Sequence, residues 1–175
     1  MNIHPREMPA LLEALRESNT RRNLQVRKNY EEAVANKLSQ VINPPEFSTD
    51  RIPTLERGIY QNSTPMLNAR FAYAGSWVNA YLAHTWLGIR EMEQVWDDVE
   101  VLEQIRIRRE NWEESPPASA PLNRISLFGI YREQCEEIYL LWDIEDSVEP
   151  RVYSYAGNYE EQFTSLADFV LYCAR

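Results

Sequence analysis

The chain has 175 residues, of which 44% are hydrophobic and 11% aromatic; this is ordinary for a globular protein and excludes a disordered chain. The length suits one domain, because two domains would each be undersized. The formal net charge of −9 disfavours nucleic acid and anionic membranes as ligands, since both present charge of the same sign. A basic protein partner is more compatible with this charge.

The sequence predicts a cytoplasmic protein without a membrane span. No apolar run approaches the roughly 18 residues that cross a bilayer, and residues 1–7 contain no apolar signal core. Cys135 and Cys173 are far apart and belong to no CxxC motif. We interpret them as buried or free thiols in a reducing compartment, with a disulfide or a metal pair as the alternative.

The first forty residues have helical periodicity. A short apolar stripe follows Pro5 and Pro9, and after the polar run 18–20 a second stripe recurs at steps of three and four. We expect this second stripe to form one buried helix face, ended by the prolines at 44 and 45. The two stripes are Leu11, Leu12 and Leu15, and Val26, Tyr30, Val34, Leu38 and Val41.

The middle of the chain changes period. A short helix is predicted from Pro53 to Tyr60, ended by residues 62–65. Residues 69–73 and 77–82 are aromatic and β-branched and predict a hairpin around Gly75. A helix with apolar residues at three- and four-residue steps is predicted from Arg90 to Ile105, followed by a proline-rich loop over 113–121.

The last third predicts three strands and a helix. The strands are expected at 125–131, 137–144 and 151–155, and the middle one is apolar on both faces, which is typical of a central strand. Ser165 and Asp168 resemble a capping box that opens the final helix. The order of elements predicts an α+β fold, with a mixed or antiparallel sheet flanked by helices.

No catalytic or metal-binding constellation stands out in the sequence. The two histidines are His4, in the amino-terminal tail, and His84, which has no partner at a diagnostic spacing and is interpreted as solvated or hydrogen-bonded. Two histidines and two scattered cysteines match no zinc spacing, so we expect no metal and no cofactor. Five glycines leave little material for a phosphate-binding loop.

Charged clusters are the remaining candidates. Asp97, Asp98 and Glu100 share one helix, and a solvated face is the simple interpretation of them. Asp143, Glu145 and Asp146 resemble half of a calcium loop but lack its glycine and its distal glutamate. A basic patch on the helix around residue 108 is nearly neutralised by neighbouring glutamates, which favours pairing within the helix. Its members are Arg106, Arg108 and Arg109, next to Trp112.

The layout from about residue 24 to the carboxyl end resembles the SUKH superfamily, which includes the yeast Smi/Knr cell-wall assembly regulators and bacterial immunity proteins. The similar stretches are a strand ending in Gly129, an apolar strand closed by Asp143, a Pro-x-Val-Tyr-like strand from Pro150, and a helix opening at Ser165. Upstream, residues 52–62 are similar to a Leu-Pro, helix and Tyr-x-x-Asn segment, with Ser63 where glycine is usual. The resemblance implies a SUKH-like domain over 23–175, an extra helical extension over 1–22, and no enzymatic activity.

Two functions follow from the resemblance together with the charge. The first is an immunity-type protein that binds and neutralises a cognate toxin domain, which is expected to be basic and in the bacterial members is often a nuclease. The second is an intracellular regulatory or scaffold protein of the Smi/Knr type. A carboxylate-dependent hydrolase is a third possibility.

The expected partner-binding surface is acidic. Residues 133–168 contain ten acidic residues and one basic residue, which is either a solvated surface or a field that attracts a basic partner. Trp142 beside carboxylates suits an interface anchor with a charged rim. The predicted partner-binding residues are Trp142, Asp143, Glu145, Asp146, Glu149, Asp97, Asp98 and Glu100.

Overall fold

The protein folds around one large antiparallel sheet. The computed structural model describes residues 3–30, 32–46, 50–112, 115–142 and 148–175. Seven strands pair in the order β1-β4-β5-β6-β7-β8-β9, and every neighbouring pair is antiparallel. These strands are β1 (Val41–Ile42), β4 (Trp77–Tyr81), β5 (His84–Trp86), β6 (Ile125–Tyr131), β7 (Glu136–Leu141), β8 (Arg151–Ala156) and β9 (Tyr159–Phe163).

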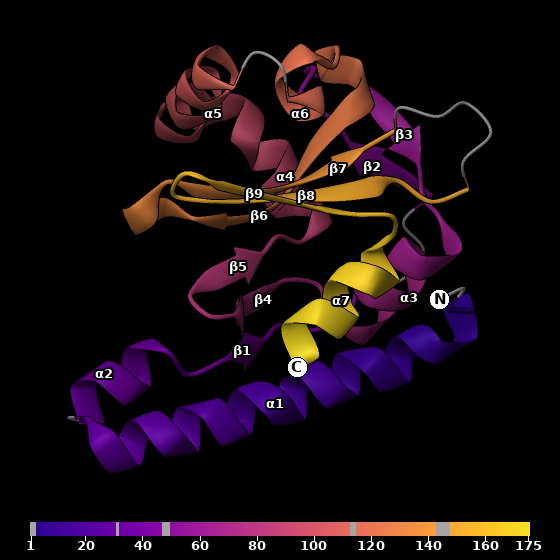
Figure 1. Cartoon of the computed structure of the whole chain (residues 1–175). Helices are drawn as coiled ribbons and strands as arrows, with labels where there is room; N and C mark the ends of the chain where they lie inside the picture. The colour runs from indigo at the N-terminus through magenta and orange to yellow at the C-terminus, as the bar shows by residue number, and fades with distance from the viewer. Residues whose placement is uncertain (1–2, 31, 47–49, 113–114, 143–147) are drawn as a thin grey trace.

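Helices cover both faces of this sheet (Figure 1). On one face lie α4 (Ile89–Gln94), α5 (Val99–Asn111) and α6 (Pro116–Ser119). On the other lie α3 (Pro65–Tyr73) and α7 (Leu166–Ala174), with α1 (Met8–Asn29) packed beneath them and α2 (Glu32–Lys37) folded back at its end. A two-stranded sheet of β2 (Arg51–Pro53) and β3 (Tyr60–Asn62) stands beside α4. The predicted α+β class is confirmed, with an antiparallel sheet.

The carboxyl-terminal elements match the sequence prediction closely. β6 occupies the predicted residues, while β7 and β8 differ from them by three residues or fewer at either end. β7 lies between β6 and β8 and is buried along nearly its whole length, as its two apolar faces predicted. Ser165 caps α7 by accepting a hydrogen bond from the backbone N–H of Asp168, which confirms the predicted helix start.

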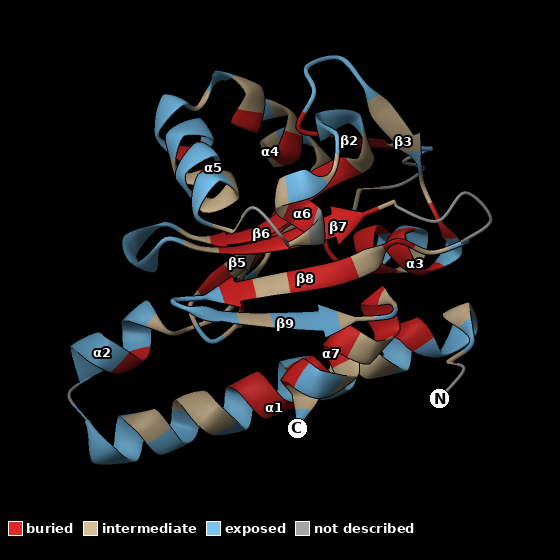
Figure 2. Ribbon diagram, turned by 45° about the horizontal axis from the view of Figure 1, so that its top comes forward, coloured by how far each residue is buried: buried red, intermediate tan, exposed pale blue. Residues whose placement is uncertain are grey.

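Burial in the core follows the same part of the chain (Figure 2). Leu140, Val152, Leu166 and Phe169 are all fully buried or within 1% of it. Phe169 packs its ring against Trp86 and Phe163, with centroid distances of 5.5 and 5.2 Å. The last helix is therefore an integral part of the core.

The predicted buried face over Val26 to Val41 is wrong. α1 ends at Asn29, α2 is a separate helix, and Val41 belongs to strand β1. Tyr30 is 65% exposed and Val34 43% exposed. The reason is geometric: α1 continues past the end of the sheet, so its far half has no core to pack on (Figure 1). We call residues 20–30 and 32–38 the arm.

The predicted division between residues 22 and 23 falls inside the single helix α1. Met8, Leu12 and Leu15 have no exposed surface and belong to the same hydrophobic cluster as the sheet. These three residues are therefore part of the core, because the near half of α1 lies across α3 and α7.

Two central predictions also fail. Residues 51–62 form the β2–β3 hairpin in place of a helix, with a turn that uses Gly58 at a φ of +77°. Residues 65–73 form helix α3 in place of a strand. Thr64 accepts a hydrogen bond from the N–H of Leu67, and Pro65 occupies the first turn, so the supposed helix breaker is a helix start.

The predicted helix over 90–105 is divided. α4 and the 3₁₀ helix η2 (Val95–Asp97) come first, and Asp98 then starts α5 by accepting from the N–H of Val101. Further 3₁₀ helices are η1 (Pro5–Glu7), η3 (Leu122–Arg124) and η4 (Arg132–Gln134). Strand β9 was not predicted, because its sequence is mostly polar and gives no alternating pattern.

A fully buried arginine joins the middle elements. The guanidinium of Arg70 donates to the carbonyls of Ala74, Gly75, Trp86 and Leu87, which belong to the loop after α3 and the end of β5. Burial lowers the pKa of Arg70 to about 9, so the side chain stays charged at neutral pH. Gly75 in this loop passes close to the backbone of Pro44: a Cβ there would lie 2.3 Å from the carbonyl oxygen of Pro44.

Candidate functional site

A groove of about 680 Å³ opens on the α4–α5 side of the sheet, between α2 and the start of α5. Its floor is apolar and buried, formed by Leu87, Val95, Val101, Leu127 and Ile130. These side chains come from the end of β5, from β6 and from the two helical segments above them.

The groove continues beneath the arm. A second hollow of about 350 Å³ shares Leu38, Asn79, Ala83 and Tyr131 with the first, so the two form one surface. Its other walls include Val26 of α1, exposed Leu82 and the Glu136 carboxylate. Val34 and Leu38 of the failed apolar stripe therefore line a groove and not a core.

Backbone strain lies at Asn79, inside β4, and at Leu82, in the turn between β4 and β5. Asn79 and Leu82 have φ angles of +53° and +51°, which cost a non-glycine residue on the order of 1 kcal/mol or more. Asn79 uses the position: its Nδ2 donates to the carbonyls of Lys37 and Ser39 at 2.9 and 2.8 Å. This amide ties the arm to the sheet, and the strained turn leaves the Leu82 side chain 53% exposed.

One wall of the groove is acidic. Asp98 caps α5 through Oδ1, and its Oδ2 lies 2.7 Å from a guanidinium nitrogen of Arg132. The hydrogen bond from Arg132 lowers the pKa of this carboxyl, so it is ionised at neutral pH. Glu133 follows Arg132 and is exposed at the groove edge.

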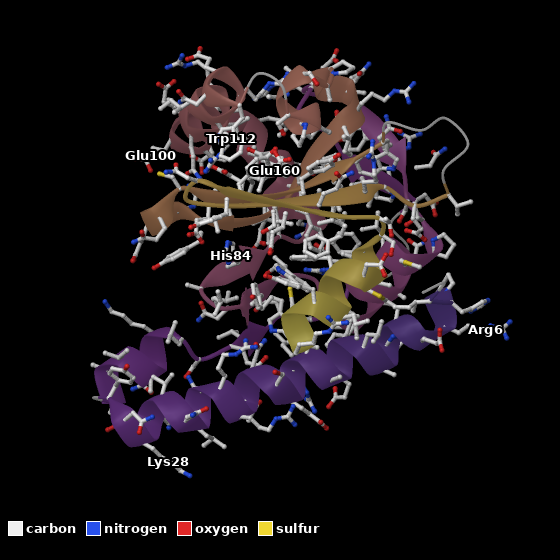
Figure 3. The ribbon with its side chains drawn as sticks, viewed as in Figure 1. Arg6, Lys28, His84, Glu100, Trp112 and Glu160 are labelled. Carbon is white, nitrogen blue, oxygen red and sulfur yellow. The ribbon has the colours of Figure 1, made fainter. Side chains whose placement is uncertain are left out.

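Two further acids flank Asp98 in the sequence, next to this wall. Asp97 accepts a hydrogen bond from Arg57, and Glu100 is exposed on the first turn of α5 (Figure 3). Beside them Val99 is 78% exposed. We call Asp97, Asp98, Glu100 and Glu133 the acidic rim.

His84 lies beneath the groove in strand β5 (Figure 3). It is 3% exposed, its Nδ1 lies 3.2 Å from the carbonyl oxygen of Tyr81, and its Nε2 lies 3.2 Å from Oε2 of Glu136. Burial lowers the pKa of the imidazole, and the Glu136 carboxylate opposes that shift. The interpretation of His84 as a hydrogen-bonded residue agrees with the Tyr81 contact, although the side chain is buried.

The described members of the predicted partner-binding set fall into two separate groups. Asp98 pairs with Arg132, which follows β6, whereas the backbone N–H of Trp142 donates to the carbonyl of Arg124, which precedes β6. The acidic rim and Trp142 therefore lie at opposite ends of the β6–β7 hairpin. The structure does not bring them onto one face.

The second group is partly engaged inside the fold. Trp142 is half-buried and packs against the core. Glu149 accepts hydrogen bonds from the Thr64 hydroxyl and from the N–H of Met66, so it caps α3, and burial raises the pKa of its carboxyl. Asp143, Glu145 and Asp146 lie outside the described residues.

Other members of the acidic run also have internal roles. Glu137 is buried and receives a hydrogen bond from Arg108 at 2.9 Å and from Gln104 at 2.6 Å. Desolvation raises the pKa of Glu137 despite these donors. The predicted pairing within α5 is right for Arg106, which bonds Glu103 and Glu110, but Arg108 pairs across to β7.

The described residues contain no group of three or more histidine, cysteine, aspartate or glutamate side chains placed to hold a metal ion. In the same ranges, Cys135 and Cys173 are both free thiols, the first exposed and the second buried. None of the helices that the structure describes combines the length and apolar character required to cross a bilayer. Comparison with protein-family models, with curated proteins and with solved structures finds no match for the chain.

The groove itself was not predicted from the sequence. Its floor comes from segments forty residues apart, which no local pattern joins. One clue was available, in the apolar stripe of Val26, Val34 and Leu38. Once the helix ends at residue 29, this stripe lacks the apolar partners that would bury it.

Proposed function

We propose that the protein acts by binding a protein partner and not by catalysis, with the groove and its acidic rim as the contact surface. The observation that supports this most directly is the composition of the groove. An apolar floor is bounded by ionised or exposed carboxylates, and apolar side chains such as Val99 stand exposed beside it. Interfaces commonly combine an apolar centre with a charged periphery.

The partner in this proposal is a basic toxin domain, and the protein is an immunity-type inhibitor. The net charge of −9 favours capture of a cation-rich surface, because complementary fields raise the association rate. Glu100 and Glu133 of the rim are exposed and would face such a partner without first breaking an ion pair with a described residue. The SUKH-like layout motivates the choice of a toxin.

A regulatory or scaffold protein of the Smi/Knr type is the second candidate. Such a protein would use the same groove to bind a cellular partner in place of a toxin. The exposed arm supports this candidate, because a scaffold needs several separate contact surfaces. Both functions need the domain to be cytoplasmic, which is part of the proposal.

The test starts from the neighbouring gene. If an adjacent gene ends in a short basic domain, co-expression of that domain with this protein is expected to restore cell growth, and the two are expected to bind in calorimetry. A basic neighbour that neither binds nor becomes less toxic contradicts the immunity proposal.

Two charge-reversed proteins then locate the surface. Glu100→Lys with Glu133→Lys changes the rim, and Asp143→Lys with Glu145→Lys and Asp146→Lys changes the acidic segment that follows Trp142 in the sequence. We expect the rim pair to slow association at low salt by roughly tenfold and to weaken its salt dependence. If the second set alone slows association about tenfold and the rim pair does not, the contact surface lies at the other end of the hairpin.

A further inference from the structure

Strand β9 is an open edge of the seven-stranded sheet. It is the last strand in the order, and its packing partners are β8 on one side and α7 below. Figure 2 shows its ribbon largely exposed in front of β8. Tyr159 is 79% exposed, and Glu161 and Gln162 are also exposed. The other edge, β1, has only two residues and offers far less backbone.

Natural edge strands usually carry devices that prevent further pairing, such as proline, lysine or a bulge. β9 has neither proline nor lysine among its five residues. Its register with β8 is continuous from Ala156–Tyr159 to Val152–Phe163, so no bulge twists it away. An edge of this kind is competent to accept another strand.

The register defines which backbone groups are free to do so. Ala156 and Tyr159 flank a two-residue turn and form a hydrogen-bonded pair, and pairs alternate from there along an antiparallel ladder. Glu161 and Phe163 are then bonded to β8. The N–H and C=O groups of Glu160 and Gln162 point away from the sheet, which provides two donors and two acceptors for an added strand.

The edge is also negatively charged on both faces. Glu160 accepts a hydrogen bond from the Ser115 hydroxyl on the α5 side, and Glu161 accepts one from the Tyr172 hydroxyl on the α7 side at 2.9 Å. Neither carboxylate forms an ion pair with a lysine or arginine in the described parts of the chain. Their charge is held in place by hydroxyl groups and is not neutralised.

This charge selects the occupant. A second copy of the chain, paired antiparallel through the middle of β9, would set Glu161 opposite Glu161 and add Glu160 from both strands. Like charges directly opposite each other destabilise a strand pair. A strand with lysine or arginine on both faces would instead meet a carboxylate on each side.

We propose that β9 binds an extended, basic segment of a protein partner, which pairs with it as an eighth strand of the sheet. That the segment belongs to a protein partner rests on the proposed function, whereas the open edge and its charge do not. The added strand takes hydrogen bonds from Glu160 and Gln162 and places its cations beside the Glu160 and Glu161 carboxylates.

The experiment uses the whole chain and a synthetic eight-residue peptide in which pairs of lysines alternate with pairs of threonines, so that lysines lie on both faces of the strand. The control peptide has glutamates in place of the lysines. Backbone amide exchange is measured by nuclear magnetic resonance during titration. We expect the amides of Glu160 and Gln162 to exchange at least about tenfold more slowly at saturation, while the amide of Glu161, already bonded to β8, does not change. The effect is expected to weaken as salt is raised.

Two variants test the assignment. Glu161→Lys is expected to weaken peptide binding about tenfold, and Gln162→Pro removes an outward donor at an edge position where proline is tolerated. Glu56→Lys, in the exposed β2–β3 turn, is the matched charge control and should bind the peptide as the parent does.

Each remaining outcome overturns the inference. Equal binding of the acidic peptide removes the charge argument, and exchange protection confined to the groove places the peptide there. Concentration-dependent dimers that Gln162→Pro abolishes would make a second copy the occupant. Toxin neutralisation that survives Gln162→Pro, in a chain that does not bind the peptide, contradicts this inference and leaves the proposed function intact.

Discussion

The two halves of α1 belong to the same helix but lie in different surroundings. Residues 8–19 pack across α3 and α7, with Met8, Leu12 and Leu15 fully buried. Beyond residue 20 the helix runs past the sheet, and Leu24 and Tyr30 are more than half exposed. Periodic apolar residues are present in both halves. Burial therefore depends on whether a core lies opposite the stripe, and not on the stripe itself.

The difference divides the roles of the helix. The near half contributes to stability, because its leucines fill the same cluster as the sheet. The arm is tied to the rest of the fold by polar contacts, including those of Asn79 to the carbonyls of Lys37 and Ser39 and of Arg22 to the carbonyl of Cys173. Apolar side chains left exposed there line the groove and are available to a partner.

Deletion of residues 1–18 tests the near half and has the largest expected effect. Removing three fully buried side chains exposes the surfaces of α3 and α7 that they cover, so we expect the cooperative thermal transition to be lost. Circular dichroism during heating measures it, and deletion of residues 1–3 is the control. A truncated chain that still melts cooperatively would restore the view of this segment as a separate extension.

A pair of truncations compares the halves directly. Leu12→Ala leaves a cavity in the core and is expected to cost about 2 to 5 kcal/mol of unfolding free energy. Val34→Ala, on the half-exposed side of the arm, is expected to change it by less than about 0.5 kcal/mol. Urea denaturation gives both values. Similar losses at the two positions would mean that the arm is packed as tightly as the near half.

The carboxyl-terminal half of the fold could be predicted because its cues are local. β7 is apolar on both faces, and Ser165 with Asp168 marks the start of α7 within four residues. β9 could not be predicted, because this largely exposed edge strand has no alternation of apolar and polar residues. Thr64 and Pro65 suit the end of a helix as well as its start. The contacts that fix α3, such as those of Arg70 with four carbonyls, are tertiary and cannot be recognised in the local sequence.

The candidate site was predictable only in part. Asp98 was identified as part of an acidic cluster, and the structure places it on the groove wall, paired with Arg132. Whether Asp98 lies close to Trp142 depends on which end of β6 each residue contacts, and the strand register determines this. Leu82 carried no cue at all, because its exposure follows from a turn with positive φ.

Asn79→Gly tests how the arm is attached. Glycine accepts the positive φ of this position without strain, so the substitution removes mainly the two hydrogen bonds to Lys37 and Ser39. We expect faster amide exchange in α2 and a fall of about 1 to 2 kcal/mol in unfolding free energy. Gly substitution at the half-buried Ala83, in the turn that follows β4, is the control. Unchanged exchange in α2 would show that other contacts hold the arm.

The smallest expected effect concerns His84, where the body meets the arm. The groups that face its ring are Tyr81, Tyr131 and the Glu136 carboxylate. Burial lowers the pKa of His84 in the folded protein, so between that value and the unfolded value of about 6.5 the unfolded chain binds more protons. This contribution to stability is therefore complete above pH 6.5 and is lost as the pH falls through that window.

The variant His84→Gln isolates this contribution. Glu137 and Glu149 have raised pKa values and act in the opposite sense, because the folded state takes up their protons first as the pH falls. The quantity to measure is the loss of unfolding free energy from pH 7.5 to 5.5 in the parent, minus the same loss in the variant. A positive difference is expected, because only the parent has an imidazole at this position, which binds its proton more readily in the unfolded state than in the folded one. Equal losses would mean that His84 becomes protonated in place, with the Glu136 carboxylate compensating fully for its burial, and the junction between arm and body would then be insensitive to pH.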